Sequence, residues 1–330
     1  MKKIYGSLFF IALMVFISAC ARDAQTEIEA PLEMPTIRIA ALRGPTALGL
    51  LPLMDAHTQQ TSQLDYEFTL LGSPDEVPPL VVRGDVDIAV VPGNLASVLY
   101  NRTDGDVVAL AVVTLGVLHI VDTTGEIHSV EDLRGRTVFV SPQGATPEFA
   151  LNYVLEQNGL VPGVDVHIEF RSEHTELAAL LEAGQAEIAL LPEPFVSTVL
   201  ARVDGLRIAL DLTEEWNRVQ PDYNLIMSVA IAQREFAETH RDAIMTFMYE
   251  YQNSIYFMMN NLTEAAQLAV DYGIIGNVQI AYNALPRTHL TFITGSEMQQ
   301  NLMGFYHVLY TALPASIGGQ MPSEDFFFIP

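Results

Sequence analysis

Residues 84–97 read GDVDIAVVPGNLAS, and one hundred residues later residues 184–197 read GQAEIALLPEPFVS. Each stretch has a glycine, an apolar run, a proline and a serine in the same order. Upstream, Gly44 and Thr46 also recur at this spacing. A near-continuous apolar run is typical of a buried parallel strand. A period this long indicates one supersecondary unit used twice, and two similar α/β lobes favour a ligand cleft between them.

The rest of the chain alternates between strand and helix patterns. Strands are expected at 36–42, 66–71, 86–91 and 107–115, and again at 136–141, 165–171, 186–191 and 206–211. Helices are expected between them, after Pro45 to about His57 and at 73–82, 95–101, 147–158, 174–183 and 195–202. This alternation predicts a parallel-sheet α/β fold. Two extended runs, 117–121 and 225–232, are expected where the chain passes between the lobes, and 240–310 is expected to be helical and to pack on the first lobe.

The beginning of the chain has the features of an export signal. Two lysines precede the apolar run SLFFIALMVFISA at 7–19, which is too short to span a bilayer comfortably. The run ends in Ile-Ser-Ala-Cys, which resembles a bacterial lipobox with Cys20 as the acylated residue. We expect residues 1–20 to be a lipoprotein signal peptide and 21–35 a tether. An ordinary secretory signal with a stray thiol is the alternative.

Composition narrows the classes of partner. The chain has 330 residues, a formal net charge of −24, half of its residues hydrophobic, and a single cysteine. An internal disulfide is therefore impossible. Nucleic acid is not an expected partner, since binding a phosphate backbone needs clustered Lys and Arg. The expected location is extracytoplasmic, lipid-anchored at Cys20 and without a membrane-spanning segment.

Several segments resemble the periplasmic substrate-binding proteins of ABC importers, in particular the sulfonate, nitrate and thiamine-precursor binders. They include ALRGPTALGLLPLMD, GDVDIAVVPGNLASVLYN, TLGVLHIV, EDLRGRTVFVSPQGATPEFALNYVLEQNGL and ALLEAGQAEIALLPEPFVSTVLAR. The resemblance implies α/β architecture with two Rossmann-like lobes of a type II periplasmic binding protein, joined by a two-strand hinge. Lobe 1 would comprise 36–116 plus 236–330, and lobe 2 would comprise 117–235. It also implies a small-molecule solute, a permease, and a separate ATPase subunit, and the protein is expected to act as a monomer.

The candidate ligand-binding residues lie in four loops. In open α/β sheets, ligands bind beyond the carboxyl ends of strands, where helix N-termini present free N–H groups that suit carboxylate, sulfonate or phosphate. The loops 43–46, 93–95, 143–146 and 193–195 have this placement. Their glycines allow close approach of the backbone, although turn geometry alone also explains them. The candidates are Gly44, Thr46, Gly93, Asn94, Gly144 and Thr146.

Four further candidates carry charge or a ring. Arg43 is suited to an anionic ligand group, or to a salt bridge. Glu193 is suited to a ligand amine, or to stabilising its own helix terminus. Phe195 and Trp216 are candidates for stacking on a ring, with core packing as the alternative.

Catalysis has little support in the sequence. The eight histidines are scattered, none lies in an HExxH-like cluster, and there is no GxSxG motif. We therefore predict no catalytic residue, metal site or cofactor. A phosphate-binding GxxxxGK[ST] loop is also lacking, so ATP hydrolysis would belong to another subunit. Two alternatives to a transport binding protein stay open, a bilobal enzyme resembling those of the menaquinone pathway and a ligand sensor for a membrane receptor.

Overall fold

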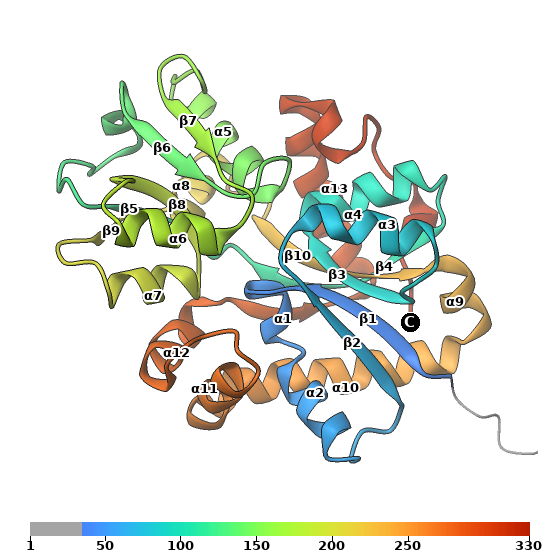
Figure 1. The fold of residues 1–330 in the computed structure, drawn as a ribbon. Coiled ribbons are helices and arrows are strands. Elements are labelled where there is room, and N and C mark those ends of the chain that lie inside the picture. Colours follow the sequence, from blue (N-terminus) through green and yellow to red (C-terminus); the bar gives the residue numbers. More distant parts are fainter. Residues whose placement is uncertain (1–34) are drawn as a thin grey trace, which may run out of the picture. The chain divides into compact units, whose positions relative to one another are not determined.

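The computed structural model describes residues 35–330, which form one compact unit. The predicted signal peptide and Cys20 lie outside the described residues. Within 35–330 the chain forms two β-sheets flanked by helices (Figure 1). In this part of the chain, no helix combines the length and apolar character needed to cross a membrane.

The first sheet has six strands in the order β11-β4-β10-β3-β1-β2. They are β1 (Ile37–Leu42), β2 (Tyr66–Leu71), β3 (Ile88–Pro92), β4 (Val107–Leu115), β10 (Ile226–Gln233) and β11 (Leu290–Ile293). The second sheet has five strands in the order β7-β6-β8-β5-β9. They are β5 (Leu118–Asp122), β6 (Thr137–Val140), β7 (His167–Phe170), β8 (Ile188–Pro192) and β9 (Arg207–Asp211).

The repeat in the sequence is a repeat in the fold. Strands β1, β2, β3 and β4 occupy the same places in the first sheet as β6, β7, β8 and β9 in the second. β1 pairs in parallel with β2 and β3, and β6 pairs in parallel with β7 and β8. The expected α/β architecture is therefore confirmed, and the structure adds that the two copies share one strand order.

Each sheet also contains an antiparallel strand between the third and fourth strands of its copy, which the predicted parallel sheet did not include, and β11 pairs antiparallel with β4 at the edge of the first sheet. β10 lies between β3 and β4, and β5 lies between β8 and β9. β10 belongs to the first sheet, although the sequence analysis assigned its residues to the second lobe. Only Gly116 and Val117 separate β4 from β5, so the chain passes from sheet to sheet within two residues.

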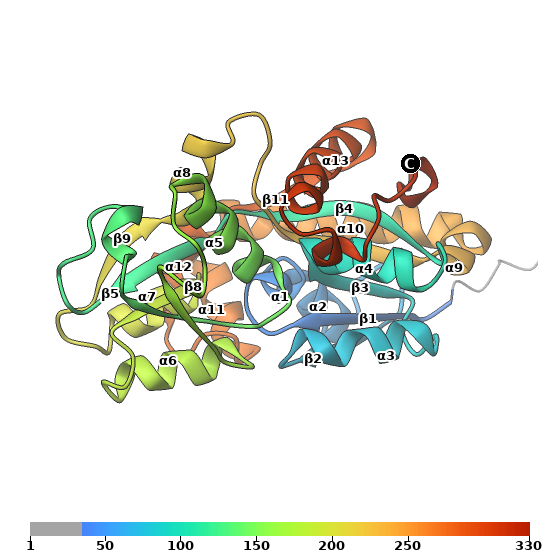
Figure 2. The same cartoon turned by 90° about the horizontal axis from the view of Figure 1, so that it is seen from above.

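The helices cover both faces of the sheets (Figures 1 and 2). They are α1 (Pro45–Leu48), α2 (Leu51–Thr58), α3 (Val77–Val82), α4 (Gly93–Arg102), α5 (Thr146–Gln157), α6 (His174–Glu182), α7 (Phe195–Leu200), α8 (Leu212–Val219), α9 (Arg234–Thr239), α10 (Arg241–Asn260), α11 (Leu262–Asp271), α12 (Val278–Ala284) and α13 (Gly295–Ala312). The segment 240–310 is mainly helical, as expected, and within it α10 packs on α2 beneath the first sheet. β11 interrupts it.

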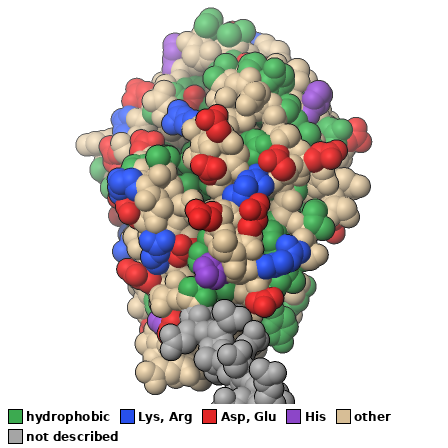
Figure 3. Space-filling view, turned by 90° about the vertical axis from the view of Figure 1, so that its right-hand side faces the viewer, with side chains coloured by type: hydrophobic (Ala, Val, Ile, Leu, Met, Phe, Trp, Pro, Cys, Tyr) green, Lys and Arg blue, Asp and Glu red, His purple; other side chains and the backbone are tan. Residues whose placement is uncertain are grey.

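The apolar residues form a core on each side of the first sheet. One face packs against α2 and α10 through residues such as Leu51, Phe247 and Tyr251. The other continues through α4 and α13 into the second sheet, where it includes Trp216. On the face that Figure 3 shows, basic and acidic side chains are interspersed and form no continuous positive patch.

Candidate ligand-binding cleft

A small cavity lies where loops from both sheets meet. Its walls come from the loops that follow β1, β2 and β3 in the first sheet and β6, β7 and β8 in the second, together with β10. The cavity has a volume of about 50 Å³. The lining residues are Leu42, Arg43, Pro45, Thr46, Gly72, Pro74, Pro92, Pro142, Ala145, Pro147, Ser172, Glu173, His174, Pro192, Met227 and Ser228.

Proline dominates the lining, with six residues that lie in both sheets' loops. Proline has no backbone N–H and a fixed φ, so these walls are rigid and poor in hydrogen-bond donors. Polar chemistry is therefore confined to a few side chains and the remaining backbone N–H groups. Among the lining side chains the cation is Arg43, which forms no ion pair within residues 35–330.

His174 is the second nitrogen-bearing side chain of the lining. It begins α6, its Nδ1 lies 2.8 Å from the Ser141 hydroxyl, and its ring centroid lies 5.1 Å from that of Phe195. Burial lowers the pKa of His174 to about 4, so the imidazole is neutral at neutral pH. In the tautomer in which Nδ1 accepts from the Ser141 hydroxyl, the ring hydrogen is on Nε2, and in the other tautomer Nδ1 donates to Ser141. In both tautomers the neutral ring has one N–H donor and adds no charge to the lining.

Asn94 and Thr146 join the two sheets' loops to each other. The Thr146 hydroxyl lies 3.1 Å from Asn94 Oδ1 and 3.3 Å from the Asn94 backbone N–H. The Asn94 amide also donates to the Gly144 carbonyl at 3.1 Å. Both side chains are buried, and neither lines the cavity. The Asn94 amide also donates to the Ser316 carbonyl at 3.1 Å, so this side chain has partners on both sides of the cleft.

Glu193 makes a second connection between the same parts of the chain. Its carboxylate is fully buried, accepts from the Ser197 backbone N–H and hydroxyl, and pairs with Arg287 at 2.6 Å. Arg287 lies just before β11, which belongs to the first sheet. The helix-terminus role of Glu193 is present, together with an ion pair that sequence analysis did not anticipate. Glu193 follows Pro192, so this pair lies directly behind the cleft wall.

The candidate glycines Gly44 and Gly93 lie where two parts of the chain come close together. Gly44 has φ +119°, and a Cβ there would lie 3.1 Å from the Phe195 ring. A Cβ on Gly93 would lie 2.7 Å from the Ile226 carbonyl oxygen. Trp216 does not line the cavity: it is fully buried, packs between Tyr153 and Phe305, and donates to a backbone carbonyl. The structure therefore supports core packing for Trp216, which was the alternative to ring stacking.

Of the ten candidate residues, Arg43 and Thr46 line the cavity, and the other eight do not. Thr46 donates to the Leu42 carbonyl at 2.5 Å. Sequence analysis missed Glu173 and His174 because it looked only at the loops after the first and third strands of each copy. The parallel pairing of β6 and β7 brings the loop after β7 to the same edge.

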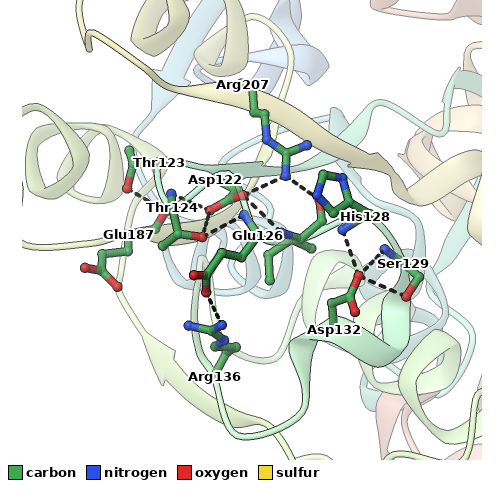
Figure 4. Close-up of polar contacts among 11 residues, drawn as sticks. Asp122, Thr123, Thr124, Glu126, His128, Ser129, Asp132, Arg136, Glu187 and Arg207 are labelled. Atoms are coloured by element: carbon green, nitrogen blue, oxygen red, sulfur yellow. Dashed lines mark hydrogen bonds and ion pairs between the residues drawn. The ribbon is translucent and has the colours of Figure 1, made fainter.

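A polar network around Asp122 lies at the opposite end of the second sheet (Figure 4). Asp122 is fully buried, bonds Thr124 and Ile127, and pairs with Arg207 at 2.9 Å. Burial alone would raise the pKa of Asp122, but these hydrogen bonds and the Arg207 charge together lower it. In the strand register Asp122 faces Ile188 while Leu118 faces Pro192, so this network is structural and lies away from the cleft.

A family model described as "ABC transporter, phosphonate, periplasmic substrate-binding protein" matches residues 48–275. The protein belongs to this family. It is therefore an extracytoplasmic solute-binding component of an ABC importer, and it works with a permease and an ATPase. The expected recognition is confirmed, and the transport reading is favoured over the enzyme and sensor alternatives. The members of the family are binding proteins and not enzymes.

Solved structures of similar proteins show the same fold. An ABC transporter protein from Parabacteroides distasonis has a TM-score of 0.72 at 20% identity, covering 89% of this chain and 98% of that chain. The aliphatic sulphonate binding protein SsuA of Escherichia coli has a TM-score of 0.68 at 16% identity, covering 89% and 92%. The alkanesulfonate-binding protein SsuA of Xanthomonas axonopodis pv. citri, bound to MOPS, scores 0.68 at 13% identity, covering 87% and 96%. A search of curated protein sequences gave no match.

Proposed function

We propose that this binding protein captures a compact oxyanion, with a phosphonate or sulfonate headgroup, in the cavity between the two sheets. The carrying observation is that six loops from both sheets close on about 50 Å³ with Arg43 in the wall. A water needs roughly 10–15 Å³ of such volume, so the space holds about three to five water-sized groups. Methylphosphonate and methanesulfonate match this size, whereas a heteroaromatic ring does not.

The lining side chains have complementary roles in this proposal. Arg43 supplies a charge-assisted hydrogen bond to the oxyanion, and neutral His174 supplies a further donor. Thr46 and Ser228 line the same cavity. The N-terminus of α5, which begins at Thr146, adds the partial positive charge of a helix dipole. The proline walls enclose the ligand's apolar substituent.

The candidate residues that do not line the cavity have a role in closing the cleft around the solute. Residues around the first sheet and residues around the second are proposed to be two lobes that rotate about their connections, a hinge motion that traps the solute. Asn94, Gly144, Thr146 and Glu193 then hold the lobes together, and Gly44 with Phe195 and Gly93 permit their close approach.

The test is a calorimetric titration of methylphosphonate and methanesulfonate into residues 21–330 and into Arg43→Gln. Charged hydrogen bonds contribute about 1.5–3 kcal/mol, so Arg43→Gln is expected to weaken binding by roughly 10- to 150-fold. Arg83→Gln is the matched control, since Arg83 is exposed and pairs with Asp85. Equal affinity of Arg43→Gln and the wild type would contradict the proposed anion site.

We also propose that the mature protein acts as a monomer anchored through lipid on Cys20. The lipobox-like segment and the tether composition support this assignment. Metabolic labelling with a radioactive fatty acid is expected to mark the wild type and not Cys20→Ser, which should be released into the soluble fraction. Sedimentation of residues 21–330 should give a single species near monomer mass, and a stable dimer would contradict the second part.

A further inference from the structure

The wall of the cavity includes a carboxylate, which the capture of an anion does not by itself explain. Among the lining side chains, Arg43 is the cation and Glu173 is the carboxylate, and the neutral ring of His174 adds no charge. The charges of Arg43 and Glu173 cancel. An oxyanion that binds to Arg43 therefore also meets a like charge at Glu173, and like charges placed side by side disfavour binding.

The position of Glu173 in the sequence does not account for its side chain. Glu173 directly precedes α6, where side-chain oxygens commonly accept hydrogen bonds from the free backbone N–H groups of the first turn. Within residues 35–330 its carboxylate makes no such capping bond. Oε2 instead accepts from the Thr175 hydroxyl at 2.9 Å. Capping of its own helix is therefore not the role of this carboxylate.

The Glu173 carboxylate lies against a loop of the other sheet. A Cβ on Gly72 would lie 3.0 Å from Glu173 Oε1 and 3.6 Å from Oε2. Gly72 also lines the cavity and follows β2 of the first sheet, whereas Glu173 follows β7 of the second. The absence of a side chain at Gly72 leaves room for an acceptor at this wall. Glu173 is also exposed, so solvent screens its charge but leaves its capacity to accept a hydrogen bond.

The charged groups next to Glu173 do not neutralise it. The groove that adjoins the cavity contributes Asp75, Arg171 and Glu176. Arg171 lies 3.2 Å from Glu169 and 3.7 Å from Glu176. The positive charge of this groove is thus paired with carboxylates other than Glu173. A hydrogen-bond donor for Glu173 is therefore expected on the ligand.

We infer that Glu173 selects the protonation state of the ligand, accepting a hydrogen bond from the P–O–H group of a phosphonate monoanion while Arg43 binds an ionised oxygen. A singly protonated phosphonate has a hydroxyl as well as oxygens that share a negative charge, so it matches an acceptor and a cation together. A sulfonate at neutral pH has no hydroxyl, and neither does a phosphonate dianion. Each of these would place a bare oxygen opposite the carboxylate, with no hydrogen between them.

This inference rests on the proposed capture of an oxyanion, and it distinguishes between the two headgroups of that proposal. A site that hydrogen-bonds a ligand hydroxyl rejects an analogue without one, because the protein group is left unpaired. Glu173 thus makes sulfonate the poorer ligand of a cavity that is large enough for both. It acts on the headgroup and not on the apolar substituent, which the proline walls enclose.

The test is calorimetric titration of methylphosphonate and methanesulfonate into the wild type at pH 6 and pH 9. Hydrogen bonds to charged groups give preferences of roughly 10- to 150-fold. Because Glu173 is exposed, we expect a value at the lower end, about tenfold in favour of methylphosphonate at pH 6.

The pH dependence gives a second comparison. Above the second pKa of methylphosphonate, its affinity should fall by about tenfold per pH unit, because the dianion must take up a proton to bind. The affinity for methanesulfonate should be the same at both pH values. His174 stays neutral over this range, because burial lowers its pKa to about 4.

Glu173→Gln replaces the carboxylate with an amide whose N–H donates to either oxyanion. The variant should lose the preference for methylphosphonate and bind methanesulfonate at least about fivefold more tightly than the wild type. Its affinity for methylphosphonate should vary less with pH. Glu176→Gln is the matched control, because Glu176 lies in the first turn of the same helix and does not line the cavity. It should bind both ligands as the wild type does.

Phosphorus NMR of bound methylphosphonate reports the ionisation state of the ligand directly. The monoanion should persist in the wild-type complex above the pH at which the free ligand ionises, and a bound dianion would overturn the inference. Equal affinity of the wild type for the two ligands, or an unchanged preference in Glu173→Gln, would also overturn it while the proposed anion site stands. If the wild type binds neither ligand, the proposed function itself fails.

An amine on the ligand is the remaining way to satisfy the carboxylate. Tighter binding of aminomethylphosphonate than of methylphosphonate, with the gain lost in Glu173→Gln, would assign Glu173 to an ammonium group and overturn the inference. Equal binding of the two phosphonates would support the assignment to the P–O–H group.

Discussion

The two copies of the repeat use one backbone plan for different tasks. At the position after the third strand, the first copy has Gly93 and the second has Glu193. The glycine lets α4 begin against the Ile226 carbonyl, whereas the glutamate is a buried ion-pair partner. Thr46 bonds its own loop at Leu42, while its counterpart Thr146 bonds the other copy. Strand order is thus common to the two copies, and side-chain roles are not.

The strands that complete each sheet differ in the same way. β10 places Ala232 opposite Ile88, and β5 places Asp122 opposite Ile188. An alanine that needs no partner in one sheet corresponds to a buried carboxylate with several partners in the other. Duplicated architecture therefore tolerates a polar centre in one copy only, provided that the surrounding loop supplies its partners.

Breaking this polar centre should have the largest effect on stability. Asp122→Ala leaves Arg207 and two backbone N–H groups without their acceptor, and loss of one partner of a buried pair costs about 3–5 kcal/mol. Urea unfolding at pH 7 measures this loss. Glu126→Ala is the control, because the Glu126–Arg136 pair is exposed and surface pairs contribute about 0–1 kcal/mol.

Lowering the pH should remove the contribution of Asp122 to the free energy of unfolding. Because the folded state lowers the pKa of Asp122 below its ordinary value of 3.8, its stabilisation is fully present above pH 3.8. It is lost as the pH falls from 3.8 toward the lower folded value. The difference in unfolding free energy between wild type and Asp122→Ala should shrink over that window. A difference that stays constant to pH 2.5 would show that the charge of Asp122 is not the source.

Substitution of the two loop glycines, Gly93 and Gly144, should have the next largest effect on stability. Gly93→Ala places a Cβ 2.7 Å from a backbone oxygen, and such overpacking costs roughly 1–3 kcal/mol. Gly144→Ala meets no atom within 4 Å and is strained only through its φ of +76°, at about 1 kcal/mol. Thermal unfolding should rank wild type above Gly144→Ala and that above Gly93→Ala. The reverse order would mean that backbone conformation outweighs crowding here.

Substitution of Thr46 and Thr146, which occupy equivalent positions in the two copies, should have the smallest effects. The two variants distinguish a contribution to closure of the cleft from a contribution to the stability of the fold. Thr146→Val removes a bond across the cleft worth about 1 kcal/mol, so methylphosphonate affinity should fall roughly fivefold with little change in unfolding free energy. Thr46→Val removes a bond within one loop and should lower the unfolding free energy by about 1 kcal/mol. Titration and urea unfolding of both variants make the comparison.

Local patterns in the sequence predict the elements well and their pairing less well. The strands at 66–71 and 107–115 have the bounds that their apolar patterns predict. The antiparallel places of β5 and β10 are not visible in the sequence, because pairing depends on distant segments, such as Ile88 and Ala232, which are 144 residues apart along the chain. Short elements such as β11 and α8 were missed, since four to eight residues carry little periodicity.

For the candidate site, too, the sequence predicts the local features better than the contacts between distant segments. The rule that ligands bind beyond the carboxyl ends of strands locates the cleft and identifies Arg43 and Thr46. It does not tell whether a polar side chain in such a loop faces a ligand or the opposite loop. Asn94 and Glu193 have the residue types of ligand contacts, but their partners are Thr146 and Arg287 from distant parts of the sequence.

The order of strands has a consequence for how the protein is made. The second sheet is built from one continuous stretch, 118–211, whereas the centre of the first sheet stays open until β10 is synthesised. The last residues are needed too, because Phe328 donates to the Ala109 carbonyl at the outer side of β4. Contacts this distant along the chain form slowly. The first sheet therefore stays incomplete in a nascent chain until residues 290–328 have been synthesised.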